Sequence, residues 1–139
     1  MNSITVTVVV RAEPEAAFRM FTGEIETWWK RGPQYRLGNG ALRFDEDRLV
    51  EGDVELGRVL VWDPGQRLRL ELRNWRLGRG EPTQVEVRFE PAGDGTRVTV
   101  THSGWETRTT GAAEFRTVVG LWWGALLSAL QGRLPPATK

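Results

Sequence analysis

The chain has 139 residues, no cysteine, one histidine and seven tryptophans, and its 19 basic and 18 acidic residues leave a net charge of +1. This length corresponds to one domain, and we expect residues 1–139 to form it, because no linker, repeat or low-complexity tract divides them. The composition excludes disulfides, a thiol nucleophile and thiolate metal ligands, and the balanced charge argues against a nucleic-acid partner.

The N-terminal third is predicted to hold one strand and two helices. Residues 3–10 alternate β-branched apolar residues with threonine, which is typical of a strand. Pro14 suits the first turn of a helix, and Gly23 ends that helix. A second short helix is expected to carry the adjacent Trp28 and Trp29.

The middle of the chain is predicted to consist of strands and tight turns. Apolar and polar residues alternate most clearly over 67–74 and 84–90, and Gly93-Asp94-Gly95 is typical of a hairpin turn. One-sided alternation indicates an antiparallel sheet with one face toward the core and the other toward water. The expected strands are 41–45, 48–53, 56–62, 67–74, 84–90 and 96–103.

The last predicted element is a long helix over residues 112–132. At the helical repeat its apolar residues form one stripe, which we expect to face the sheet with Trp122 at its centre. Trp123 lies at the margin of this stripe, and Leu121 lies outside it, where it could form a small contact in a weak dimer. The stripe consists of Phe115, Val118, Val119, Trp122, Leu126, Ala129 and Leu130.

The order of the predicted elements indicates the α+β class. Strands and helices are segregated along the chain, and one long amphipathic helix must cover the apolar face of a sheet of about six or seven strands. An antiparallel sheet of this size curves, so a straight helix cannot fill its inner side everywhere. We therefore expect a cavity between helix and sheet, which is a common place for an apolar ligand.

Several short motifs, in this order, resemble one superfamily. Nearly the whole chain resembles the SRPBCC or START-like helix-grip superfamily, and within it the branch named for activators of the heat-shock-protein-90 ATPase. The resemblance implies a curved antiparallel sheet wrapped on a long C-terminal helix, and an interior that binds lipids, hormones or polyketides. The motifs are Pro14-Glu15 with Phe18, Trp28-Trp29, Gly57 to Leu60, Trp62-Asp63-Pro64, Leu68 to Trp75, Gly95 to Trp105 and Trp122-Trp123.

His102 is the most informative polar residue. It follows Val98 and Val100 at the strand period, and Asn74 likewise continues the apolar side of residues 67–74. Each should therefore point inward, where a polar group needs a hydrogen-bond partner. His102 is either a structural residue satisfied by its neighbours or a group that orients a ligand. A general base would need partners, and we find no acidic residue clearly placed inside.

These observations predict a domain that binds a small apolar or amphipathic molecule. Two other functions remain open: a chaperone or stress accessory that acts on a protein partner through its surface, and a cyclase- or hydratase-like enzyme using the same cavity. No catalytic residue is assigned. We expect the cavity to be lined by Trp28, Trp29, Phe44, Trp62, Asn74, His102, Phe115, Val119, Trp122 and Leu126.

Other kinds of site have no support in the sequence. The glycine-rich segments lack the pattern of a dinucleotide or phosphate loop, so we expect no cofactor, and one histidine argues against a metal site. Arg67, Arg69 and Arg73 are expected to form a solvated outer face balanced by glutamates. No apolar run reaches the roughly 20 residues of a membrane span, and the N-terminus lacks a signal-peptide pattern, so we expect a cytoplasmic protein. We expect it to be a monomer or a weak dimer.

Overall fold

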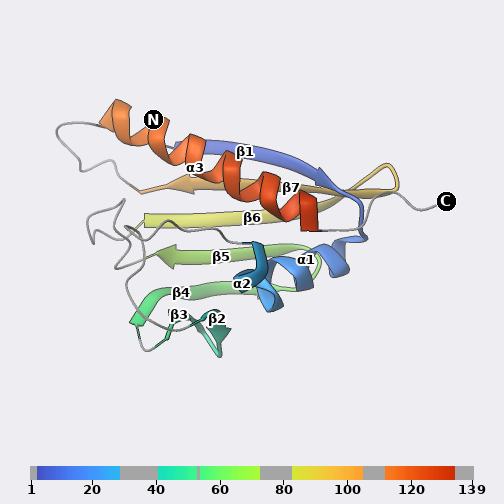
Figure 1. Ribbon diagram of the computed structural model, residues 1–139, viewed down its shortest axis with the longest axis horizontal. Coiled ribbons are helices and arrows are strands. Elements are labelled where there is room, and N and C mark those ends of the chain that lie inside the picture. The colour runs from blue at the N-terminus through green and yellow to red at the C-terminus, as the bar shows by residue number, and fades with distance from the viewer. Residues whose placement is uncertain (1–2, 29–40, 53, 73–82, 105–111, 134–139) are drawn as a thin grey trace.

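The computed structural model describes residues 3–28, 41–52, 54–72, 83–104 and 112–133; within the last range, the side chains of 112–116, 118, 122 and 133 are outside the description. The fold is α+β, as predicted, with a seven-stranded sheet and a long C-terminal helix (Figure 1). The elements are β1 (Ser3–Val10), α1 (Pro14–Gly23), α2 (Ile25–Trp28), β2 (Leu42–Asp45), β3 (Arg48–Glu51), β4 (Val54–Asp63), β5 (Arg67–Leu72), β6 (Thr83–Ala92), β7 (Gly95–Ser103) and α3 (Ala112–Arg133).

The strands form one antiparallel sheet in the order β1-β7-β6-β5-β4-β3-β2. β2 to β7 follow one another as a meander, and the first strand, β1, pairs with the last, β7, at the edge of the sheet. This pairing places Ile4 opposite His102, and His102 opposite Val85 on β6. The N-terminal strand therefore lies beside the last strand, and α3 packs along it (Figure 1).

A β-bulge in β4 changes which of its residues face the core. The register with β5 shifts between Val59 and Val61, so that Trp62 lies opposite Leu68. Leu68 is fully buried, so Trp62 shares the inner face of the sheet. Without the extra residue, strict alternation from Val59 would have directed Trp62 to the outer face.

The inner face carries the core. The inward residues of β5 and β7, and those of β6 from Thr83 to Phe89, are buried, which confirms the alternation read from the sequence. α1 and α2 cover the part of this face where β4 ends and β5 begins, and α3 covers the β1 and β7 side (Figure 1). The fully buried members on the sheet include Leu68, Leu70, Leu72, Val85, Val87, Val98 and Val100.

The rotation of α3 differs from the prediction. Val119, Leu126 and Leu130 are buried as expected, but Trp123 and Leu127, which were placed at the margin, are buried as well. The side chain of Trp122 is outside the described part of the helix. The sequence could place Trp123 only at the margin because no charged residue occurs between positions 116 and 133 to mark the solvent side.

Candidate functional site

Six aromatic side chains form a continuous cluster on the inner face. Trp62 lies at one end, with ring centroids 5.1 Å from Phe18 and 5.6 Å from Phe44. The contacts continue through the body of the domain to α2, with centroid distances of 5.2 Å for Phe18–Phe89, 5.9 Å for Phe21–Phe89 and 4.8 Å for Phe21–Trp28. The cluster thus joins β2, β4, β6 and both short helices.

The two ends of this aromatic cluster differ in exposure. Trp28 is fully buried, and its indole nitrogen donates to the Met20 carbonyl oxygen at 3.1 Å, so the ring is fixed between α1 and α2. Trp62 is 46% exposed although it stands on the inner face. Phe44 is partly buried against the core. The Trp62 end is therefore an apolar rim of the interior, whereas Trp28 is part of the core.

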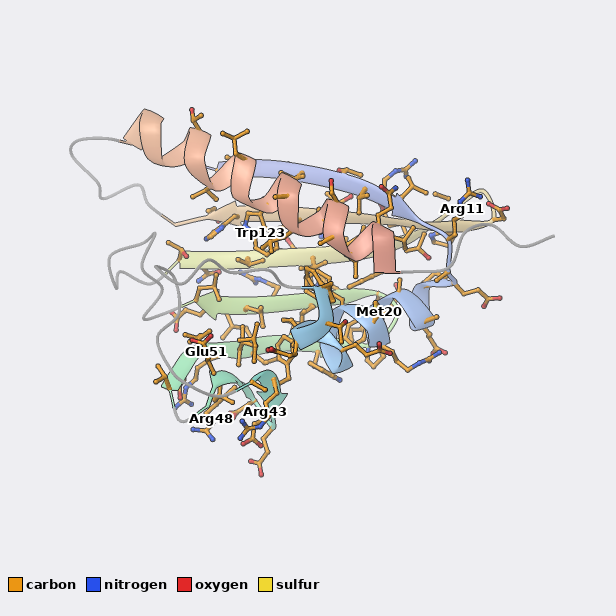
Figure 2. The ribbon with its side chains drawn as sticks, viewed as in Figure 1. Arg11, Met20, Arg43, Arg48, Glu51 and Trp123 are labelled. Atoms are coloured by element: carbon orange, nitrogen blue, oxygen red, sulfur yellow. The ribbon has the colours of Figure 1, made fainter. Side chains whose placement is uncertain are left out.

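A second group, the polar chain, connects α3 to the sheet. The Trp123 indole nitrogen donates to His102 Nδ1 at 2.9 Å, and His102 Nε2 lies 2.8 Å from Thr83 Oγ1. All three side chains are buried. Trp123 projects from α3 toward β7 and β6 (Figure 2). The inward direction predicted for His102 is confirmed, and both ring nitrogens have protein partners.

Burial controls the protonation of this histidine. Desolvation lowers the pKa of His102 from its ordinary value of 6.5 to about 3. The imidazole is therefore neutral at physiological pH. Since both nitrogens are engaged and the ring resists protonation, the geometry favours a structural and orienting role over that of a general base.

Glu51 is a buried acidic residue that the sequence analysis missed. It is fully buried on β3, opposite Leu42, on the same side of the strand as Leu49. Our expectation that no acidic residue clearly lies inside is therefore wrong. The two-residue spacing from Leu49 was the available indication, because side chains two apart on a strand share a face.

The remaining predicted lining residues are only partly brought together. Val119 and Leu126 lie on the buried side of α3, beside Trp123. Trp29 and Asn74 lie outside the described residues, as do the side chains of Phe115 and Trp122. The predicted lining set is thus divided between the aromatic cluster and the polar chain.

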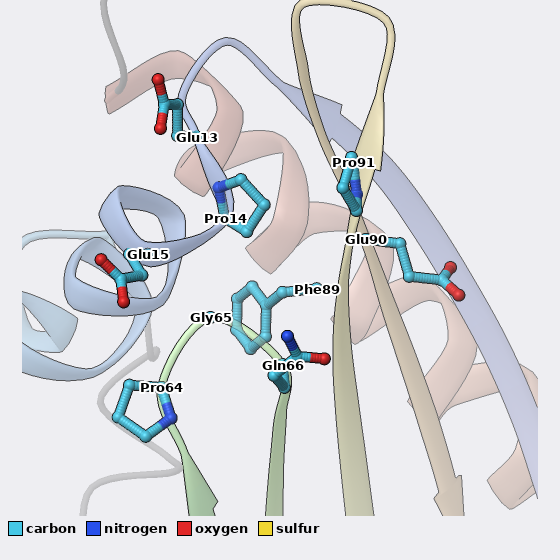
Figure 3. A pocket seen from close by; sticks show the side chains of 9 residues that line it. All are labelled: Glu13, Pro14, Glu15, Pro64, Gly65, Gln66, Phe89, Glu90 and Pro91. Atoms are coloured by element: carbon cyan, nitrogen blue, oxygen red, sulfur yellow. The ribbon is translucent and has the colours of Figure 1, made fainter.

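An open pocket lies where β4 and β5 meet the start of α1 (Figure 3). Its volume is about 340 Å³. Gly65 has a φ of +77°, and a Cβ there would lie 2.9 Å from Glu15 Cγ, so the turn packs closely on the helix. None of the predicted site residues is among its lining residues, which are Glu13, Pro14, Glu15, Pro64, Gly65, Gln66, Phe89, Glu90 and Pro91.

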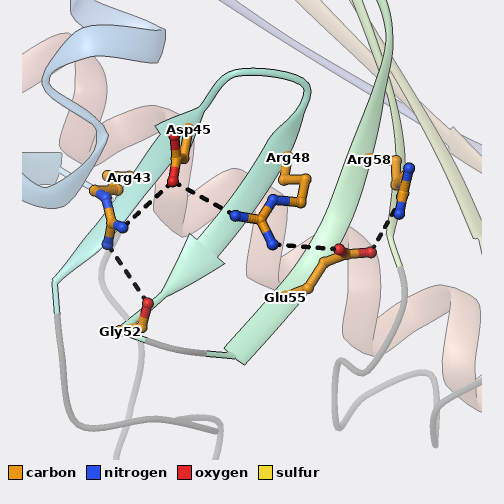
Figure 4. Close-up of polar contacts among 6 residues, drawn as sticks. All are labelled: Arg43, Asp45, Arg48, Gly52, Glu55 and Arg58. Carbon is orange, nitrogen blue, oxygen red and sulfur yellow. Dashed lines mark hydrogen bonds and ion pairs between the residues drawn. The ribbon is translucent and has the colours of Figure 1, made fainter.

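The outer face is covered by paired charges. On β2 to β4, Asp45 lies 3.5 Å from Arg48, and Glu55 lies 3.3 Å from Arg58 (Figure 4). On β5, Arg67 lies 3.4 Å from Glu86, as predicted, whereas Arg69 donates to Gln84 at 2.6 Å and Arg73 lies outside the described residues. Such exposed pairs each contribute about 1 kcal/mol or less.

The described residues lack two kinds of feature. No three or more histidine or acidic side chains in this part of the chain are grouped so that they could hold a metal ion. No helix in the same residues is long and apolar enough to cross a membrane.

Comparisons with known proteins agree with this architecture. Residues 11–134 match the model of the family described as Activator of Hsp90 ATPase homolog 1-like protein. A search of the curated proteins finds no match. Among solved structures, protein CV1439 from Chromobacterium violaceum is 18% identical, with a TM-score of 0.65 over 99% of this chain and 100% of that one.

Two further solved structures share the fold. The Aha1 dimer from Colwellia psychrerythraea is 19% identical, with a TM-score of 0.59 over 94% of this chain and 97% of that one. DynU16, from the dynemicin biosynthetic locus, is 20% identical, with a TM-score of 0.65 over 95% of this chain. The chain spans 46% of the length of DynU16. At these identities the likeness shows the fold alone.

Proposed function

The chain belongs to the Activator of Hsp90 ATPase homolog 1-like protein family, and on that basis we propose that it binds a small, largely apolar molecule against the inner face of the sheet, under the helices. The observation that carries the proposal is the position of Trp62. A large aromatic side chain on the inner face, in contact with two other rings, is left 46% exposed. An exposed ring beside other apolar rings on the inner face supports a binding place for an apolar molecule.

The interior suits an amphipathic ligand. Its apolar part would lie against the aromatic cluster, where burial of apolar area supplies affinity. The polar chain of Thr83, His102 and Trp123 is buried on the same face of the sheet and would orient the polar part. Aromatic polyketides, fatty acids, sterols and flavonoids are four classes of compound that combine an apolar body with polar groups in this way.

The proposal is tested by an NMR titration of the backbone amides and indole N–H groups with these four classes of compound. We expect saturable shifts in β4, β7 and α3 for at least one class. Trp62→Ala should weaken that binding about five- to thirtyfold, since a tryptophan offers more apolar contact area than any other side chain. Leu121→Ala is the matched control, because Leu121 is 73% exposed on α3 and should leave the affinity unchanged.

Two results would contradict the proposal. The first is an unchanged spectrum with every compound, which would favour a partner-binding protein that acts through its surface. The second is equal affinity of the wild type and a correctly folded Trp62→Ala variant, which would remove Trp62 from the site. Turnover of a bound compound would instead favour the cyclase- or hydratase-like alternative.

A further inference from the structure

The polar chain has a direction, which is set by the tryptophan. An indole nitrogen can only donate, so His102 Nδ1 accepts the hydrogen bond from Trp123. A neutral imidazole then carries its proton on Nε2, and that N–H donates to Thr83 Oγ1. Each member of the chain thus donates to the next, and the sequence of donors ends at the hydroxyl hydrogen of Thr83.

The Thr83 hydroxyl hydrogen has no acceptor among the residues that the structure describes. Thr83 is 2% exposed, and a buried donor without an acceptor is costly. Successive hydrogen bonds also polarise one another, which makes the last donor of such a chain a stronger one. An acceptor supplied by a bound molecule would complete the chain.

Thr83 is joined to α3 through His102 and Trp123. It is the first residue of β6 and lies on the inner face, opposite the buried Leu72 of β5. Gly104 lies beside it, because a Cβ at Gly104 would be 3.1 Å from Thr83 Cα.

The chemistry of the interior narrows the class of acceptor. None of the buried side chains in the described ranges is a lysine or an arginine, so an anionic group would have no counter-charge there. We propose, on the basis of the function proposed above, that the Thr83 hydroxyl donates a hydrogen bond to a neutral carbonyl oxygen of the ligand. Ketones, quinones, lactones and flavone-type carbonyls belong to this class.

The test uses two probes of nearly the same shape. Methyl β-naphthyl ketone carries a carbonyl oxygen, and β-ethylnaphthalene has a methylene group in its place. The dissociation constants of both are measured by NMR titration for the wild type, Thr83→Val and Thr83→Ser. Comparing the two ligands across the three proteins separates the loss of the hydroxyl–carbonyl contact from any effect of the substitution on the shape of the interior.

We expect Thr83→Val to weaken binding of the ketone about three- to tenfold and to leave the hydrocarbon unaffected. Thr83→Ser keeps a hydroxyl and should retain most of the ketone affinity. In the wild type, the carbonyl stretching frequency of the bound ketone should be lower than in an apolar solvent. This infrared measurement needs no variant, so it tests the contact even if Thr83→Val does not fold.

The outcomes separate this inference from the proposed function. If both probes bind but Thr83→Val lowers their affinities equally, the hydrogen bond is refuted and ligand binding stands. The same holds if the carbonyl stretching frequency of the bound ketone equals its value in an apolar solvent. If neither probe binds the wild type, the interior site itself is refuted for aromatic ligands, and the role of Thr83 is refuted with it.

Discussion

Acidification should destabilise the protein through His102 before most carboxylates are protonated. The folded imidazole stays neutral to about pH 3, whereas an unfolded histidine takes up a proton near pH 6.5. Between these values the unfolded state binds more protons, so the free energy of unfolding falls as the pH falls. The loss approaches about 1.4 kcal/mol per pH unit and reaches about 2 kcal/mol between about pH 7 and pH 5.

Urea unfolding followed by tryptophan fluorescence at several pH values measures this slope. The His102→Gln variant is the control, because an amide keeps a donor and an acceptor but does not titrate in this range. We expect the stability of the wild type to fall between about pH 7 and pH 5 and that of the variant to change much less. Equal slopes for the two proteins would refute the reasoning.

A second measurement does not depend on the variant. His102 is the only histidine of the chain, so one imidazole carbon-bound proton signal reports its protonation without ambiguity. That signal should keep its neutral position down to about pH 4 in the folded protein. A titration midpoint near the ordinary histidine value would show that the ring is solvated and that the polar chain is not formed as described.

Two other substitutions test the packing around the candidate site. Trp123→Phe removes the indole donor and leaves buried His102 Nδ1 without that hydrogen bond. Urea unfolding should therefore show a free energy of unfolding that is lower by about 1–3 kcal/mol. A change within about 0.5 kcal/mol, the usual effect of a neutral surface substitution, would contradict this. Gly65→Ala should lower the free energy of unfolding by about 1 kcal/mol or more in thermal unfolding, because its φ is +77° and the new Cβ would crowd Glu15. Gly23→Ala is the control, because its new Cβ meets no neighbouring atom, and it should leave the stability unchanged or raise it.

The strands and the long helix could be read from short-range patterns. Residues 67–74 and 96–103 alternate at a period of two, and they form β5 (Arg67–Leu72) and β7 (Gly95–Ser103). The helix expected over 112–132 is α3 (Ala112–Arg133). These predictions succeeded because the period of side-chain direction is a property of each element by itself.

The candidate site could be predicted only in part. Strand period alone directed His102 inward, but its partners Thr83 and Trp123 are 19 and 21 positions away and come from other elements. The alternation also could not foresee the bulge that turns Trp62 onto the inner face. A bulge adds one residue to one strand only, so it becomes visible when the partner strand is known.

The rotation of α3 about its axis is the clearest feature that depends on the tertiary structure and not on the sequence of the segment alone. The sequence by itself determined that this segment is a long apolar helix that must cover the sheet. It did not determine that Trp123 faces inward, because no charged residue between positions 116 and 133 marks an outer side. The rotation is set by packing, since a Cβ added at Gly120 would lie 3.8 Å from Ile4 Cδ1, and by the hydrogen bond that joins Trp123 to His102.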